Sequence, residues 1–85
     1  MFIECYKIPI QDWNKKDQEI RIPDNKILIS LNSIEYITSA THNPNRAVIL
    51  LSGDVRINIL ASYEKILAKI ENLGETTHIM NRLDD

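Results

Sequence analysis

The sequence contains few of the residues that build covalent or metal-bound sites. Its 85 residues include one cysteine, two histidines, two glycines and one tryptophan. A single cysteine, Cys5, excludes an internal disulfide and a cysteine-based zinc cage. We therefore expect a reducing compartment, because disulfides persist in oxidising ones. Gly53 stands alone between apolar runs and lacks the glycine-rich context of a phosphate-binding loop.

Long apolar runs are also missing. The longest uninterrupted run, residues 47–51, is far shorter than the ~20 residues that a membrane span needs. The opening residues MFIECYKI contain neither a basic region nor a long apolar stretch, so a secretory signal is not predicted. From these absences we expect a cytoplasmic protein that has no membrane partner.

Neither sign of charge dominates. Ten Lys and Arg against twelve Asp and Glu give a net charge of −2, which does not attract the whole molecule to a polyanion. The hydrophobic content of 44% is ordinary for a globular chain. A chain of this length forms one domain at most. We expect a single domain over residues 1–85, with an ordered core at 1–74 and a mobile or loosely helical tail at 75–85.

The chain is organised around a hairpin within residues 47–59. An apolar run at 47–51 and an alternating run at 55–59 flank a turn that contains Gly53, which predicts two antiparallel strands. A two-residue turn is the favoured interpretation. It places Val48 and Leu50 on the face shared by Val55, Ile57 and Ile59. A three-residue turn instead places Ala47, Ile49 and Leu51 on that face, and the sequence alone leaves the choice open.

A helix follows the hairpin. Ser62 is a favourable N-cap, and Gly74 offers a C-terminal stop. The spacing between them predicts one apolar stripe, formed by Tyr63, Ile66, Leu67, Ile70 and Leu73.

Sequence patterns upstream of the hairpin predict further strands that pack beside the hairpin and the helix. Alternating or β-branched runs predict strands at residues 2–8, 26–31 and 34–38. A polar excursion at 11–25 carries a candidate short edge strand at 19–22, and residues 41–45 form a loop by composition. The predicted fold is α+β: a small, mainly antiparallel β-sheet of three to five strands with one C-terminal α-helix packed on one face.

The apolar run at 47–51 has hydrophobic side chains on both faces. A strand that is buried on both sides needs cover on both sides, whereas a single helix covers one. We therefore expect the uncovered sheet face, or an edge strand, to meet a second copy in a two-fold contact, which gives a homodimer.

Residues 26–70 resemble a known small family. The order of a strand, an Asn-containing bend, an apolar strand, a Gly turn, a second strand and a Ser-Tyr-Glu helix is similar to the flagellar-regulatory family called FlbD. The matching stretches are residues 31–35 (LNSIE), 48–53 (VILLSG) and 62–66 (SYEKI). The resemblance implies a short antiparallel sheet followed by one helix. The segment around Trp13 and the loop at 42–46 depart from the family pattern, so we carry over the architecture and not a flagellar or transcriptional role.

Cys5 is the candidate nucleophile, with His42 or His78 as its base. It lies in the middle of a predicted strand among apolar neighbours, where a free cysteine behaves as a small hydrophobe, so we predict a core position. The two histidines are far apart in sequence and neither has a second ligand one helical turn away, which disfavours a zinc site. We predict no catalytic residue, no cofactor and no metal.

Trp13 stands next to basic residues, and this is the most suggestive combination in the chain. An aromatic ring can stack on a nucleobase while lysines reach phosphate, although interleaved acidic residues weaken that attraction. We rank packing of Trp13 over the sheet first, contact with a protein partner second and nucleic acid third. The candidate partner-binding residues are Trp13, Lys15, Lys16, Arg46 and Arg56.

Two functional classes follow from these features. The leading hypothesis is a small non-enzymatic protein-interaction or regulatory module that self-associates through its sheet and binds an unidentified protein partner. The alternative is a nucleic-acid-binding module that uses the Trp13, Lys15 and Lys16 segment with Arg46 and Arg56. An enzyme ranks third, because no motif supports one.

Overall fold

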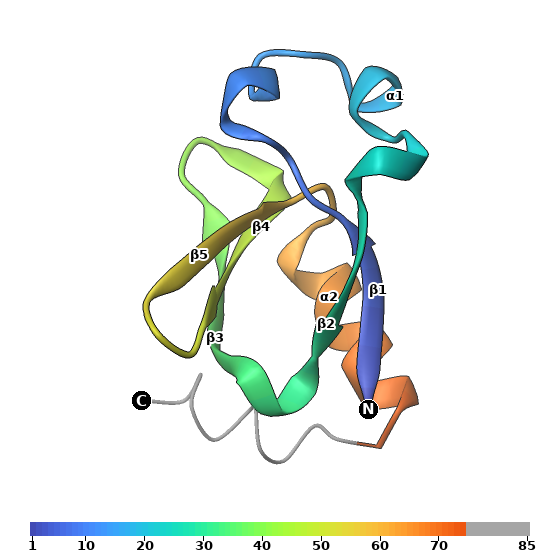
Figure 1. Ribbon diagram of the computed structural model, residues 1–85, viewed down its shortest axis with the longest axis vertical. Coiled ribbons are helices and arrows are strands. Elements are labelled where there is room, and N and C mark those ends of the chain that lie inside the picture. Colours follow the sequence, from blue (N-terminus) through green and yellow to red (C-terminus); the bar gives the residue numbers. More distant parts are fainter. Residues whose placement is uncertain (75–85) are drawn as a thin grey trace.

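The computed structural model describes residues 1–74 and contains two small antiparallel sheets (Figure 1). Strands β1 (Phe2–Tyr6) and β2 (Lys26–Ser30) form a two-stranded ribbon. A three-stranded sheet has the order β3-β4-β5. The predicted α+β class is confirmed. The remaining strands and the helices are β3 (Ile34–Ala40), β4 (Asn43–Leu51), β5 (Val55–Ile59), α1 (Asp17–Ile20) and α2 (Tyr63–Asn72), with 3₁₀ turns at Ile10–Asp12, Pro23–Asn25 and Leu31–Ser33.

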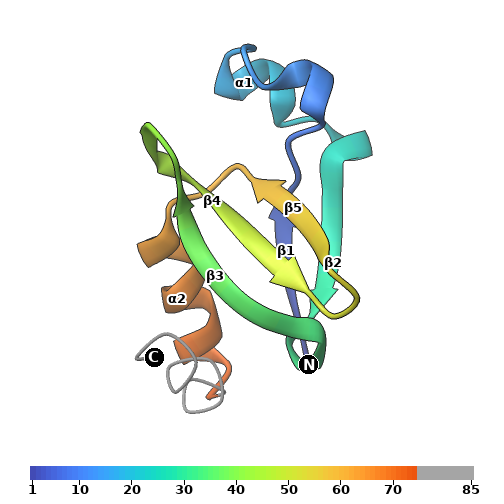
Figure 2. The ribbon, with the colours of Figure 1, turned by 90° about the vertical axis from the view of Figure 1, so that its left-hand side faces the viewer.

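The three-stranded sheet forms one layer, and the β1–β2 ribbon and α2 together form the other (Figure 2). The layers meet where the end of β1 crosses the end of β5. There Lys7 bridges to Ile59, and the Ile8 amide donates to the Asn58 carbonyl at 2.8 Å. The Lys69 ammonium of α2 donates to the Glu4 carbonyl at 2.5 Å, so the helix lies against the edge of β1 that β2 does not occupy.

The core lies between the two layers. Each element contributes the side chains of its inward face, as expected for amphipathic strands and helices. Helix α2 contributes Ile66 and Ile70 to this core, which confirms the predicted helix stripe. The buried cluster is Ile3, Cys5, Ile29, Leu31, Ile34, Ile37, Ala47, Ile49, Ile59, Ile66 and Ile70.

Both ends of α2 follow the sequence signals. The Ser62 hydroxyl accepts a hydrogen bond from the Lys65 amide at 3.2 Å, which satisfies one of the free amides of the first turn. At the other end Gly74 has φ +77°, the left-handed conformation that ends a helix and favours glycine. The predicted cap and stop are therefore confirmed.

The β4–β5 hairpin has a three-residue turn. Leu51 pairs with Val55, which leaves Ser52, Gly53 and Asp54 between the strands. The favoured two-residue turn was therefore wrong. Gly53 and Asp54 both have positive φ, and Asp tolerates this conformation better than most residues, so the turn extends beyond the glycine. Consequently Ala47 and Ile49 face inward, while Val48 and Leu50 are half-buried on the outer face.

Two further expectations differ from the structure. The candidate strand at 19–22 is replaced by α1, because burial of Ile20 against Ile8 and Leu60 favours a helical turn there. The predicted loop at 41–45 shortens to a turn around His42, and β4 already begins at Asn43. The pairing of β3 with β4 is irregular between Ser39 and Ala40, which accommodates Pro44 within the strand.

The expectations for residues 75–85, including His78, lie outside the described residues. Within residues 1–74, no helix has both the length and the apolar character needed to cross a bilayer.

The hairpin register predicts unequal losses of stability for two adjacent substitutions. Ile49→Ala removes a fully buried side chain and should lower the free energy of unfolding by about 2–5 kcal/mol. Leu50→Ala removes a half-buried side chain from the outer face and should cost about 1 kcal/mol. Denaturant unfolding of both variants tests this, and an equal or larger cost for Leu50→Ala would contradict the register.

Candidate functional site

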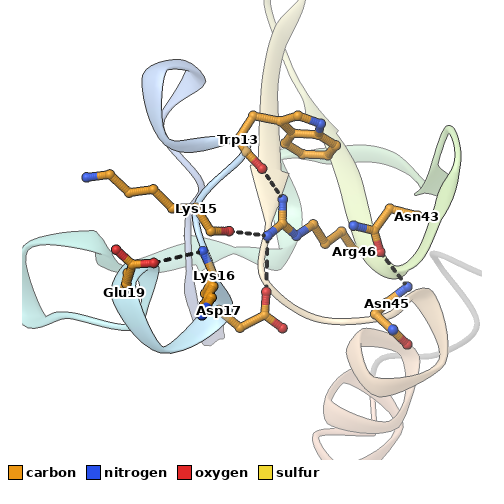
Figure 3. A network of polar contacts seen from close by, with 8 residues as sticks. All are labelled: Trp13, Lys15, Lys16, Asp17, Glu19, Asn43, Asn45 and Arg46. Atoms are coloured by element: carbon orange, nitrogen blue, oxygen red, sulfur yellow. Dashed lines mark hydrogen bonds and ion pairs between the residues drawn. The ribbon is translucent and has the colours of Figure 1, made fainter.

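Arg46 connects the polar excursion to the three-stranded sheet (Figure 3). Its side chain is only 7% exposed. One terminal nitrogen, Nη1, donates to the Trp13 carbonyl at 2.6 Å. The other, Nη2, donates to the Lys15 carbonyl and to Oδ1 of Asp17, each at 3.1 Å. The guanidinium also lies 4.9 Å from the centre of the Trp13 ring.

These contacts use the specific shape of arginine. A planar guanidinium offers several N–H donors in a fixed fork and also stacks on aromatic rings. A lysine ammonium at the same place has no such planar fork. Arg46 thus holds residues 13–17 against the end of β4, in the arrangement drawn in Figure 3.

The structure brings together three of the five candidate partner-binding residues. Trp13 is half-buried and packs against the small cluster around Ile20, while the Lys15 carbonyl contacts Arg46. The Lys15 ammonium forms an ion pair with Asp12 at 3.1 Å. The guanidinium of Arg46 is therefore bonded within its own chain, which reduces the positive charge that it presents to a partner.

The other two candidate residues lie apart from this contact. Lys16 is exposed at the start of α1. Arg56 lies on β5 opposite Leu50, where it lines a separate depression with Lys7 and Ile10. Partner binding by the five residues stays a prediction.

Cys5 is buried in the core, as predicted from its neighbours in the sequence. Burial raises the pKa of its thiol from the ordinary value of 9.0 to about 11, with smaller opposing effects from Lys69, which lowers it, and Glu4, which raises it. The thiol is therefore protonated at neutral pH. His42 is exposed on the turn before β4. Residues 1–74 contain no group of three His, Cys, Asp or Glu side chains that could hold a metal ion.

The outer face of the β1–β2 ribbon exposes large apolar side chains. Phe2 is 60% exposed and Leu28 is 65% exposed. They are diagonal neighbours, because Phe2 pairs with Ser30 and Glu4 pairs with Leu28. On the same face Glu4 forms an ion pair with Lys26 at 3.2 Å, and the pKa of the Lys26 ammonium is raised by its hydrogen bond to Glu4.

The far edge of β2 carries unpaired backbone groups. The Lys7 amide donates to the Asn25 carbonyl, and the Leu31 amide donates to the Met1 carbonyl. In an antiparallel pair, residues whose backbone groups bond to the neighbouring strand alternate with residues whose backbone groups point away. The backbone N–H and C=O groups of the odd-numbered residues of β2 therefore point toward β1. The amides and carbonyls of Lys26, Leu28 and Ser30 therefore point away from β1, and in the described part of the chain β2 pairs with β1 alone. Of these groups, the Lys26 amide is already bonded, because it donates to the Pro23 carbonyl.

Comparison of the chain with protein-family models, with curated proteins and with solved structures gave no match. The FlbD-like resemblance of residues 26–70 stays a prediction, and the interpretation of the surfaces depends on their geometry.

The Arg46 contacts predict a large cost for a single truncation. Arg46→Ala leaves two carbonyls and a carboxylate without their donor and should lower the free energy of unfolding by about 2 kcal/mol or more. Arg46→Lys should cost less, and the exposed Arg56→Ala should cost about 0.5 kcal/mol at most. Denaturant unfolding and Trp13 fluorescence measure both stability and ring exposure. A cost for Arg46→Ala no greater than that of Arg56→Ala would contradict the assigned contacts.

The raised thiol pKa predicts a pH-dependent stability. Because the folded state holds the Cys5 proton more tightly, this contribution is complete below pH 9.0 and declines as the pH rises toward about 11. The variant Cys5→Ala should lack this part of the alkaline loss. In native protein at neutral pH the thiol should also react with iodoacetamide far more slowly than in denatured protein. Equal reaction rates for the two states would overturn the buried assignment.

Proposed function

We propose that the protein is a non-enzymatic protein-interaction module that pairs with a second copy of itself through the free edge of β2. The observation that carries this proposal is the row of outward backbone groups next to the exposed Leu28 side chain, namely the Lys26 carbonyl, the amide and carbonyl of Leu28, and the Ser30 amide. An open strand edge recognises another strand through main-chain hydrogen bonds, while side chains at alternate positions supply specificity.

A two-fold axis at Leu28 uses the edge most completely. In this antiparallel register Leu28 faces its own copy, and Lys26 faces the partner's Ser30. The amide and carbonyl of Leu28 then bond to those of the partner copy, and the Ser30 amide of each copy donates to the Lys26 carbonyl of the other. The Lys26 amide takes no part, because it donates to the Pro23 carbonyl of its own chain. A register displaced by two residues leaves part of the edge unpaired. The contact is isologous, as a two-fold homodimer requires.

The side chains favour the same register. The two Leu28 side chains meet on the outer face, and Phe2 of each copy flanks them diagonally, which extends the apolar contact. Lys26 is a residue type that usually discourages edge pairing. Here its charge is already paired with Glu4, and the register places it opposite the partner's Ser30 and not opposite a second lysine.

The size of this edge implies a weak dimer. Stable interfaces typically bury about 1,200–2,000 Å² in total, whereas a short strand pair with one flanking apolar row buries less. We therefore expect the association to depend on concentration. The nucleic-acid alternative has less support, because Arg46 is bonded internally and Arg56 lies on a different part of the sheet.

Leu28→Lys tests the pairing directly. The substitution places like charges opposite each other at the two-fold axis and should raise the dimer dissociation constant about tenfold or more. Sedimentation equilibrium over a range of concentrations measures this constant. Leu28 is largely exposed in the single chain, so the variant should keep its fold.

Ile10→Lys is the matched control, because it changes charge and hydrophobicity in the same way at a side chain that is 86% exposed and far from β2 in the sequence. It should leave the dissociation constant unchanged. The proposal fails if the wild type is monomeric at every concentration. It also fails if Leu28→Lys, like the Ile10→Lys control, associates as the wild type does.

A further inference from the structure

A concave depression lies between the β1–β2 ribbon and α2, on the side of β1 that does not pair with β2. Its volume is about 210 Å³. Tyr6 and the neighbouring main chain form one side, and the first turns of α2 form the other. Leu60 and Ala61 belong to the lining, together with a group of charged residues.

Four cations converge on this depression from different segments. Arg21 follows α1, Lys26 begins β2, and Lys65 and Lys69 lie one turn apart on α2. Among residues 1–74, the lining contains a single carboxylate, Glu4, and that carboxylate is paired with Lys26 at 3.2 Å. The lining thus carries an excess of positive charge, although residues 1–85 together have a net charge of −2.

Parts of this cation group are already fixed in position. Lys69 donates to the Glu4 carbonyl, and both Arg21 and Lys26 lie 5.6 Å from the centre of the Tyr6 ring. Contact with an aromatic face orients a cation and limits its rotamers. Gathering like charges is unfavourable unless an anion balances them. The apolar side chains of Leu60 and Ala61 on the lining reduce the local dielectric screening, which strengthens the attraction between these cations and an anion.

The geometry points to a binding site for a phosphate group, held between Arg21 and the two lysines of α2. The volume of about 210 Å³ is below the roughly 300–1,000 Å³ typical of pockets for drug-sized ligands, so the site fits a compact group and not a whole nucleotide. A phosphate monoester presents close to two charges and several acceptor oxygens, which match several cations better than one carboxylate does. Its source is free phosphate or a phosphorylated side chain, and the site is independent of pairing at β2.

The test is a titration with inorganic phosphate and, separately, with O-phosphoserine, monitored by amide chemical shifts in NMR. We expect shifts centred on Tyr6, Ala61 and Lys65, with a dissociation constant in the millimolar range that weakens as salt is added. Tighter binding of O-phosphoserine indicates a phosphorylated side chain, and equal binding indicates free phosphate. The proposal is overturned if neither probe shifts these amides in folded protein.

Lys65→Ala provides the matched variant. Lys65 is exposed on α2 and alanine is a strong helix former, so the fold should persist, while phosphate affinity should fall about fivefold. Lys16→Ala removes the same charge from an exposed residue outside the depression and should leave the affinity unchanged. Equal affinities for the wild type and Lys65→Ala, or equal losses in the two variants, would contradict the site.

Discussion

The structure depends on burial of the inward face of the three-stranded sheet. Ala47 and Ile49 of β4, with Ile59 of β5, are fully buried, and no single element is wide enough to cover them. The second layer is therefore composite: α2 covers one side and the β1–β2 ribbon covers the other. Burial of this apolar surface is the dominant favourable contribution to folding in a chain this small.

In this composite layer, the two strands of the ribbon differ in how their edges are occupied. β1 lies in the middle, where β2 occupies one edge, and Lys69 and Leu60 bond to the other. β2 lies at the outside, and its inward side chains enter the core while its far edge stays unpaired among the described residues. The same arrangement that completes the core thus leaves an open strand on one side of β1 and a basic depression on the other side.

The sequence predicts those features that depend on local periodicity or on residue type at the end of a helix. The stripe of α2 is a signal of the first kind, its Ser62 cap and the Gly74 stop are signals of the second, and the structure confirms all three. The hairpin turn was mispredicted because its length depends on a positive φ at Asp54 as well as at Gly53. The four residues of α1 are too few to show a helical period.

The candidate surfaces were harder to predict, since they arise from long-range contacts. Arg46 bonds to two main-chain carbonyls and to Asp17, at sequence separations of 29 to 33 residues, and such partners leave no spacing signal. The four cations of the depression come from three segments that only the fold brings together. The outward direction of the Leu28 amide likewise follows from the register with β1 and not from residue type.

Residue-resolved hydrogen exchange of the β2 amides tests the central claim most directly. The amides of Ile27 and Ile29 bond to β1, so they should be protected at every protein concentration. The amides of Leu28 and Ser30 should exchange rapidly in dilute protein and become protected at concentrations where the chain is dimeric. Rapid exchange of these two amides in a sample that is demonstrably dimeric would contradict pairing at β2.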